Sequence, residues 1–294
     1  MRSVRLGTRR SRLAVMQAET VARLLQGRHP DVDVEIVKVV AEGDEDQPTR
    51  PGSWGKGAFV RTLQQKCLDG EIDAAVHSLK DLPLEGPDGL VLASVPLRDD
   101  PRDALVSRDR RSLHELRSGA KVGTSSERRA VQLRELRPDV EIVELRGNVD
   151  TRVRKVLEHS ACDAAVISYA ALKRLGLDHL ASEVFDVDRL VPAPGQGAIA
   201  VECLAENAEL VELFGTIEDR KARLEVEVER RVARLLGGGC RVPVGVNAMV
   251  ADGRIRIVAV STGDRGLRRS NVEGPLDSVD RLIDRIVKEM SGGG

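Results

Sequence analysis

Apolar and polar positions along the first forty residues predict a strand, a helix and a second strand. Residues 4–8, VRLGT, indicate a short strand that ends at a Gly-Thr pair. In residues 12–26 the apolar side chains recur at helical spacing, and residues 29–39 then alternate like a strand entered through a proline turn. The chain therefore opens with a β-α-β unit.

The same order of elements occurs a second time. Residues 121–145 begin with KVGT, continue with a helical SSERRAVQLREL and end with RPDVEIVEL. DAAVHSLKDL at 73–82 likewise matches DAAVISYAAL at 163–172. Three matches in one order predict two related α/β lobes, the second with shortened loops.

A third pattern follows the two lobes. Residues 219–240 predict a long charged helix that ends at three glycines, and alternating segments with a final amphipathic helix come after it. This pattern indicates a small C-terminal α+β domain. We expect three domains in all: residues 1–97 with 197–216, residues 102–192, and residues 219–294.

Composition excludes several classes of protein. A formal net charge of −1, with one Trp and one Tyr, argues against a nucleic-acid binder. No apolar run reaches membrane-spanning length and the N-terminus has no apolar signal core, so we expect a cytoplasmic protein with no membrane partner. The four cysteines are far apart, which predicts neither a metal site nor disulfides, and we expect Cys67, Cys162 and Cys203 to be ordinary buried residues.

Both Gly-Thr turns are candidate anion-binding sites. In open α/β sheets, ligands bind at the carboxyl ends of strands, against helix N-termini that attract anions. An arginine pair follows each turn, Arg9 with Arg10 and Arg128 with Arg129. The hydroxyl residues 124–126 suit the same role, although helix capping explains them equally well. The arginines favour a ligand that carries several carboxylates or phosphates.

Two further segments carry candidate chemistry. Lys80 and Asp81 stand at the end of a predicted strand, where Pro83 prevents a long helix, and they form either a site or a solvated loop pair. In LLGGGCRVPVG, residues 235–245, three glycines precede Cys240. Either a plain turn joins a helix to a strand there, or a thiol is held where a bulky group must fit beside it.

Nine short runs between residues 6 and 245 resemble the hydroxymethylbilane synthase (porphobilinogen deaminase) family, in the family's order. They are GTRRSRLA, GKGAFV, AAVHSLKDLP, DDPRDALVS, VGTSSERR, LRGNVDTR, LKRLG, APGQGA and GGGCRVPVG. The resemblance covers most of the chain and thins after residue 245. It implies that the two α/β lobes look like periplasmic binding proteins, with the small α+β domain following them.

The resemblance also implies a transferase that condenses four porphobilinogen molecules head to tail onto a dipyrromethane cofactor. Each condensation would release ammonia, and hydrolysis would free linear hydroxymethylbilane for tetrapyrrole and haem biosynthesis. The cofactor would be bound covalently to Cys240 through a thioether, and the protein would be a monomer. Because each porphobilinogen carries an acetate and a propionate, arginine forks are suitable partners for the growing chain.

Matching motifs carry the family's functional residues onto this sequence. Asp81 would be the catalytic carboxylate, which stabilises positive charge on the reacting pyrroles. The cofactor-binding residues would be Cys240, Lys80, Ser126, Arg128, Arg129, Thr124, Ser125 and Asp44. The substrate-binding residues would be Arg9, Ser11, Arg146, Arg152, Arg174, Gln196, Lys56 and Phe59. Arg12, Glu42 and the GSWGKG segment depart from the family's pattern, which leaves the contacts of these positions open.

A different class of function also accounts for two arginine-rich lobes. A cytosolic, two-lobed anion-binding module would use the same arginines without catalysis, although it gives no reason for the GGGC run. An intact mass that exceeds the chain by two pyrrole units, and loses the excess in Cys240→Ser, would distinguish the enzyme from the binding module.

Overall fold

The chain forms two compact units. The computed structural model describes residues 2–40, 58–237, 243–263 and 266–291. The first unit comprises Met1–Arg98 and Ala198–Arg223, and the second comprises Asp99–Gly197 and Leu224–Gly294. The chain therefore passes between the units at three places, after residues 98, 197 and 223.

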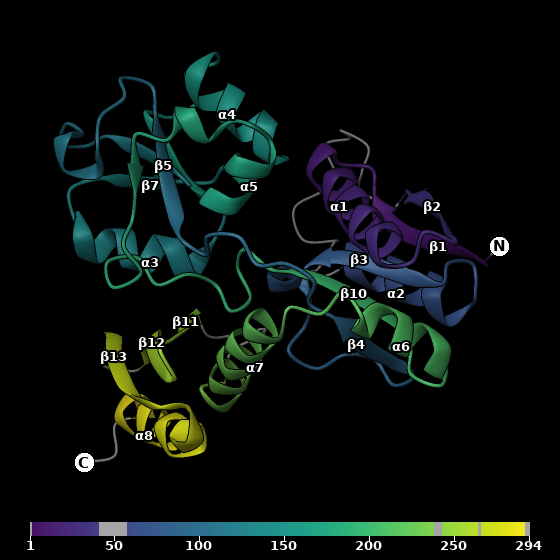
Figure 1. Cartoon of the computed structure of the whole chain (residues 1–294). Helices are drawn as coiled ribbons and strands as arrows, with labels where there is room; N and C mark the ends of the chain where they lie inside the picture. Colours follow the sequence, from purple (N-terminus) through teal and green to yellow (C-terminus); the bar gives the residue numbers. More distant parts are fainter. Residues whose placement is uncertain (1, 41–57, 238–242, 264–265, 292–294) are drawn as a thin grey trace. The chain divides into compact units, whose positions relative to one another are not determined.

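The first unit is built on a five-stranded sheet in the order β2-β1-β3-β10-β4 (Figure 1). Its strands are β1 (Arg2–Arg9), β2 (Val32–Val39), β3 (Ala74–Ser78), β4 (Leu90–Ser94) and β10 (Ile199–Leu204). Its helices are α1 (Arg12–Arg28), α2 (Ala58–Leu68) and α6 (Ala208–Gly215). Strand β1 runs parallel to β2 and β3, whereas β10 is antiparallel to β3 and β4.

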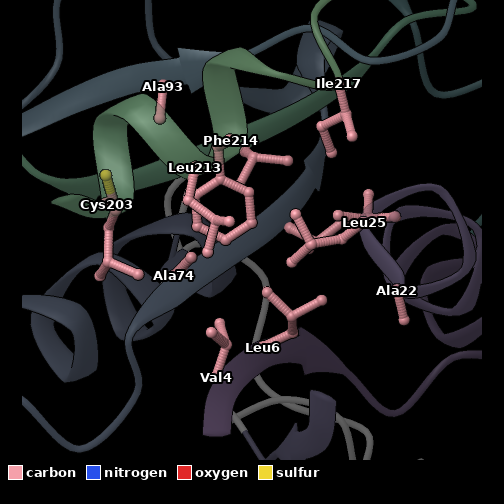
Figure 2. Packing of buried hydrophobic residues seen from close by; sticks show 14 of the residues in the cluster. Val4, Leu6, Ala22, Leu25, Ala74, Ala93, Cys203, Leu213, Phe214 and Ile217 are labelled. Carbon is pink, nitrogen blue, oxygen red and sulfur yellow. The ribbon is translucent and has the colours of Figure 1, made fainter. Parts of the chain in front are cut away.

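Apolar side chains cover both faces of this sheet. On one face, Phe214 from α6 packs with Leu25 from α1 and Leu6 from β1, as Figure 2 shows. On the other face, Leu63 and Cys67 of α2 lie in a separate cluster with Val39 and Ala75, among others. The unit is therefore a three-layer α/β structure, as the alternation of strand and helix patterns predicts.

The second unit contains a sheet with the matching order β7-β6-β8-β5-β9. Its strands are β5 (Asp103–Ser107), β6 (Lys121–Gly123), β7 (Glu141–Val143), β8 (Ala164–Ser168) and β9 (Glu183–Val184). The helices of this lobe are α3 (Glu127–Leu136), α4 (Val149–Leu157) and α5 (Tyr169–Arg174). Strand β6 is parallel to β7 and β8, and β5 is antiparallel to β8 and β9, so equivalent strands of the two sheets have the same directions. The antiparallel strand comes first along the chain in this sheet (β5) and last in the other (β10).

Equivalent contacts confirm the predicted repeat. The residue pair Leu6 and Ala74 in one sheet has the counterpart Val122 and Ala164 in the other. The glycine of each Gly-Thr turn lies close against a buried side chain. A Cβ on Gly7 would lie 2.2 Å from Cδ1 of Ile72, and one on Gly123 would lie 2.8 Å from Cδ2 of Leu145.

The C-terminal residues form the small α+β structure that the pattern predicts. A three-stranded antiparallel sheet, β11-β12-β13, follows helix α7 and is packed by helix α8. The bounds are α7 (Arg220–Leu235), β11 (Val244–Ala251), β12 (Arg254–Gly263), β13 (Gly266–Pro275) and α8 (Val279–Ser291). Val258 and Val260 of β12 cluster with Val191, so this sheet packs on the rest of the second unit. Among the described residues, no helix is both long and apolar enough to cross a membrane.

Candidate active site

Lys80 and Asp81 lie on a single 3₁₀ turn, Leu79–Asp81, directly after strand β3. The turn is short because Leu79 and Leu82 are both buried, and the N–H of Leu82 donates to the carbonyl of Leu79 before Pro83. Lys80 is half-buried and Asp81 is exposed. The buried leucines therefore anchor a turn that presents the Asp81 carboxylate to solvent.

Arg9 and Ser11 lie at the same edge of the first unit's sheet as Asp81. Strands β1 and β3 are parallel neighbours, so their carboxyl ends meet at one edge. The guanidinium of Arg9 stacks on the ring of Phe59, with its Cζ 3.9 Å from the ring centroid. Ser11 caps α1, because its hydroxyl accepts a hydrogen bond of 3.3 Å from the N–H of Ala14.

A buried polar group beneath this edge was not predicted from the sequence. Nε2 of His77, on β3, lies 3.2 Å from Oε2 of Glu202 on β10. The side chain of Gln64, on α2, donates to both oxygens of Glu202 at 3.1 and 3.2 Å. These three side chains link α2, β3 and β10, close to where β3 ends and the Lys80–Asp81 turn begins. The available signal was a charged residue at the centre of an otherwise apolar strand, IAVECL.

In the second unit, the residues of the second Gly-Thr turn lie at the N-terminus of α3. Oγ1 of Thr124 accepts a bond of 3.1 Å from the N–H of Ser126, and the hydroxyl of Ser125 donates to the carbonyl of Leu145 at 2.7 Å. Ser126 occupies the N-cap position, but its side chain makes no capping hydrogen bond. Capping therefore does not explain the hydroxyl of Ser126, which lies where a helix attracts anions.

Arg128 and Arg129 are almost fully buried, and both bind Asp103. Nη2 of Arg128 lies 2.8 Å from Oδ2 of Asp103, and Nη2 of Arg129 lies 2.6 Å from Oδ1. Arg128 also donates to the carbonyl of Val191, and Arg129 to that of Val166. From the sequence we expected these arginines to bind an external anion, and this internal carboxylate was not predicted.

The charge of the Asp103 site follows from these contacts. Burial disfavours a charged carboxylate, but the two guanidinium groups outweigh burial and hold the pKa of Asp103 well below its ordinary value. Burial in turn lowers the pKa of Arg128. Asp103 lies within the motif DDPRDALVS, and no role was predicted for it from the sequence. The available signal was a carboxylate at the start of an apolar strand, because a buried carboxylate needs a cation beside it.

Arg174 and Gln196 hold the segments through which the chain enters and leaves the second unit. Nε of Arg174 lies 2.7 Å from Oδ2 of Asp99, and its Nη2 donates to the carbonyl of Gly197 at 2.6 Å. The fully buried Gln196 donates to the carbonyl of Pro101 at 2.7 Å and to Oδ1 of Asp103 at 2.8 Å. We refer to residues 99–102 and 193–197 as the connecting segments.

Arg146 and Arg152 lie in and after the loop that follows β7. Nε of Arg146 pairs with Glu144 at 2.6 Å, and its side chain is 75% exposed. Nε of Arg152 donates to the carbonyl of Gly147 at 2.7 Å. The bond from Ser125 to Leu145 places this loop beside the Gly-Thr turn of the same unit. The predicted residues Lys56, Asp44 and Cys240 lie outside the described residues.

The three remaining cysteines, Cys67, Cys162 and Cys203, are free and buried, which confirms the prediction made for them. Burial raises the pKa of all three thiols. Within the described part of the chain, His, Cys, Asp and Glu side chains form no group of three or more that could hold a metal ion.

Two family descriptions match this chain. Residues 4–212 match "Porphobilinogen deaminase, dipyromethane cofactor binding domain", and residues 223–280 match "Porphobilinogen deaminase, C-terminal domain". A porphobilinogen deaminase of Syntrophus aciditrophicus (strain SB) is 40% identical over 298 residues, covering 99% of this chain and 96% of the relative. One of Roseiflexus sp. (strain RS-1) is 42% identical over 291 residues, covering 97% and 95%.

Solved structures of lower identity are also similar. The VFT2 domain of Bordetella pertussis BvgS is 17% identical with a TM-score of 0.45, covering 73% of this chain and 86% of that domain. The Salmonella typhimurium periplasmic binding protein STM4351, described as having high arginine specificity, is 13% identical with a TM-score of 0.42, covering 76% and 94%.

Proposed function

Since this chain belongs to the porphobilinogen deaminase family, we propose that Asp81 is its catalytic carboxylate and that Cys240 carries the family's dipyrromethane cofactor. The protein is a transferase, hydroxymethylbilane synthase, which joins porphobilinogen molecules head to tail with loss of ammonia. We further propose that it acts in the cytoplasm as a monomer and is organised as the three domains expected from its sequence.

The residues at the N-terminus of α3 fit a cofactor that bears carboxylates. Arg128 and Arg129 contribute two positive charges and Asp103 one negative charge, so the cluster keeps a net positive charge. The Ser126 hydroxyl and the end of the helix dipole add to it. We assign the cofactor carboxylates to Lys80, Thr124, Ser125, Ser126, Arg128 and Arg129, with Asp44 and Cys240 completing the set. When bound, the dipyrromethane supplies the pyrrole carbon to which the first porphobilinogen is joined.

The carboxylates of the substrate need exposed cations. Arg146 supports this role because Glu144, which pairs with its guanidinium, is also largely exposed, and such a surface ion pair is exchanged at little cost. We assign the substrate carboxylates to Arg9, Ser11, Arg146, Arg152 and Lys56. Phe59, whose ring stacks on Arg9, completes the proposed substrate-binding set. Arg174 and Gln196 were expected in the same set, but their contacts with the connecting segments support a positioning role instead.

The single observation that carries the catalytic assignment is the geometry of Asp81. Its carboxylate is exposed, whereas Leu79, the first residue of the turn, and Leu82, directly after it, are buried, so the group is accessible on an anchored turn. Loss of ammonia leaves positive charge on the pyrrole, and the attacking pyrrole also develops positive charge. A fixed carboxylate stabilises both and accepts the proton that the new carbon–carbon bond releases.

The test compares Asp81→Asn with Glu85→Gln, a change of an exposed carboxylate near the same turn. Loss of one electrostatic group of this kind lowers kcat by about 100-fold or more. We expect that loss in Asp81→Asn and near-normal turnover in Glu85→Gln. Intact mass measures whether each variant carries the cofactor. Near-normal turnover of cofactor-loaded Asp81→Asn would contradict the assignment, and active protein with an unmodified Cys240 would contradict the cofactor site.

A further inference from the structure

Asp103 is the acceptor on which three side chains from two different elements converge. Its side chain is fully buried at the start of β5. Nη2 of Arg128 binds Oδ2 at 2.8 Å, while Nε and Nη2 of Arg129 bind Oδ1 at 3.1 and 2.6 Å. Nε2 of Gln196 binds the same Oδ1 at 2.8 Å. Both carboxylate oxygens are therefore engaged inside the protein.

The two arginine side chains can lie close together because both bind the same anion. Successive residues on an α-helix point about 100° apart, and two guanidinium groups repel each other when water is excluded. Arg128 and Arg129 are neighbours in the first turn of α3, yet both reach one carboxylate. Without Asp103, two buried positive charges would face each other without an anion between them, which disfavours the observed placement of their side chains.

The remaining contacts join this cluster to a connecting segment. Gln196 lies in residues 193–197, and it also donates to the carbonyl of Pro101 in the other connecting segment. Gln132, one turn further along α3, donates to the carbonyl of Val191 and accepts from its N–H at 2.8 Å. The same carbonyl accepts from Arg128. Helix α3 is thus bonded to the chain on its way into the connecting segment.

We propose that Asp103 is a positioning residue, which sets the place of Arg128 and Arg129 at the N-terminus of α3 and couples them through Gln196 to the connecting segments. The arginines are then aligned with the cofactor by an internal carboxylate rather than by their own helix alone. This inference rests on the proposed function, because it takes the two arginines as cofactor-binding residues.

The experiment compares Asp103→Asn, which keeps the shape and removes the charge, with Asp163→Asn. Asp163 is a matched control in the same unit. It pairs with Arg108 at 3.1 Å and Arg117 at 3.3 Å and accepts a bond from the N–H of Lys121. It has no hydrogen bond or ion pair with those residues assigned to the cofactor that the structure describes. Three quantities are measured on folded protein: the fraction that carries the cofactor, by intact mass, the kcat per loaded molecule, and the KM of the loaded protein.

We expect Asp103→Asn to be loaded to a smaller fraction than Asp163→Asn. Among its loaded molecules we expect kcat to fall by about 10-fold or more, since charged hydrogen bonds are worth a factor of that order. KM should change less than kcat, because Arg146 and Arg152 have no bond to Asp103 in the described contacts. A merely structural carboxylate would reduce the yield of folded protein and leave loading and kcat per loaded molecule unchanged, which would overturn the proposal.

If Asp103→Asn does not fold, Gln196→Leu carries the test. That change removes the hydrogen bond from Gln196 to Asp103 and leaves both ion pairs. The fraction that carries the cofactor and kcat should therefore both fall, by a smaller factor than in Asp103→Asn. Values equal to those of Asp163→Asn would overturn the proposal. Wild-type protein without the cofactor's mass would instead count against the proposed function, so the two failures are distinguishable.

Discussion

Arg174 binds Asp99 through a 2.7 Å contact between Nε and Oδ2, and the same guanidinium donates to the carbonyl of Gly197. The N–H of Asp99 also donates directly to the carbonyl of Gly197 at 3.0 Å. One side chain on α5 therefore holds both connecting segments together. Burial lowers the pKa of Arg174, although its partner Asp99 opposes the shift.

Replacing Arg174 is expected to lower both the stability of the protein and its turnover. Arg174→Met leaves Asp99 without this partner and should lower the free energy of unfolding by about 2 kcal/mol, the scale of a charged hydrogen bond in a partly buried place. Arg108→Met, which removes a more exposed ion pair of the same unit, should cost under about 1 kcal/mol. Urea unfolding measures both. Equal stabilities would show that Arg174 does not hold the connecting segments.

Gly197 is expected to tolerate no side chain. Its φ is +88°, and a Cβ would lie 2.2 Å from the carbonyl oxygen of Asp99, which is backbone and cannot move aside cheaply. Gly197→Ala should cost about 3 kcal/mol or more through strain and this clash. Gly176→Ala is the matched control, since Gly176 has a φ of +71° but open space around it, and its cost should be about 1 kcal/mol. Similar losses in the two variants would contradict the close approach.

Asp139 provides a prediction about pH. A side-chain hydrogen bond from Arg137, whose Nε lies 2.7 Å from Oδ1, lowers the pKa of Asp139 from 3.8 to about 2. The folded protein thus holds this proton less tightly than the unfolded chain does. The pair therefore contributes its stability above pH 3.8 and loses it as the pH falls toward 2. Carboxyl NMR titration should find this midpoint, and Arg137→Met should return it toward 3.8; an unchanged midpoint in that variant would refute the cause.

The cysteines predict a thiol count that reports cofactor loading. Burial raises the pKa of Cys67 to about 12 and that of Cys203 to about 11, and it also raises that of Cys162. At pH 8 these three thiols should be protonated and inaccessible, so they should not react with a thiol reagent in folded protein. In denaturant, loaded protein should show three thiols, and protein without the cofactor should show all four of the chain's cysteines. Four thiols in loaded protein would argue against the thioether.

Local pattern was sufficient for the elements and for their repetition. Periodicity placed β1, α1 and β2, and the repeat of Gly-Thr turns indicated two sheets of like topology, because both signals reside in residues close together along the chain. The position of Asp81 directly after a buried strand could be predicted from the local sequence in the same way. A strand, a short turn between buried leucines and a proline leave a polar side chain at the sheet's edge.

Only the tertiary structure decided what surrounds those residues. Asp103 meets Arg128 across 25 positions and Gln196 across 93, and Gln64 meets Glu202 across 138. No periodicity encodes such pairs, since each depends on which strands become neighbours, such as β10 between β3 and β4. The sequence alone determined that arginines gather at the end of a strand. Folding decided that two of them turn inward, because a buried carboxylate requires positive charge beside it.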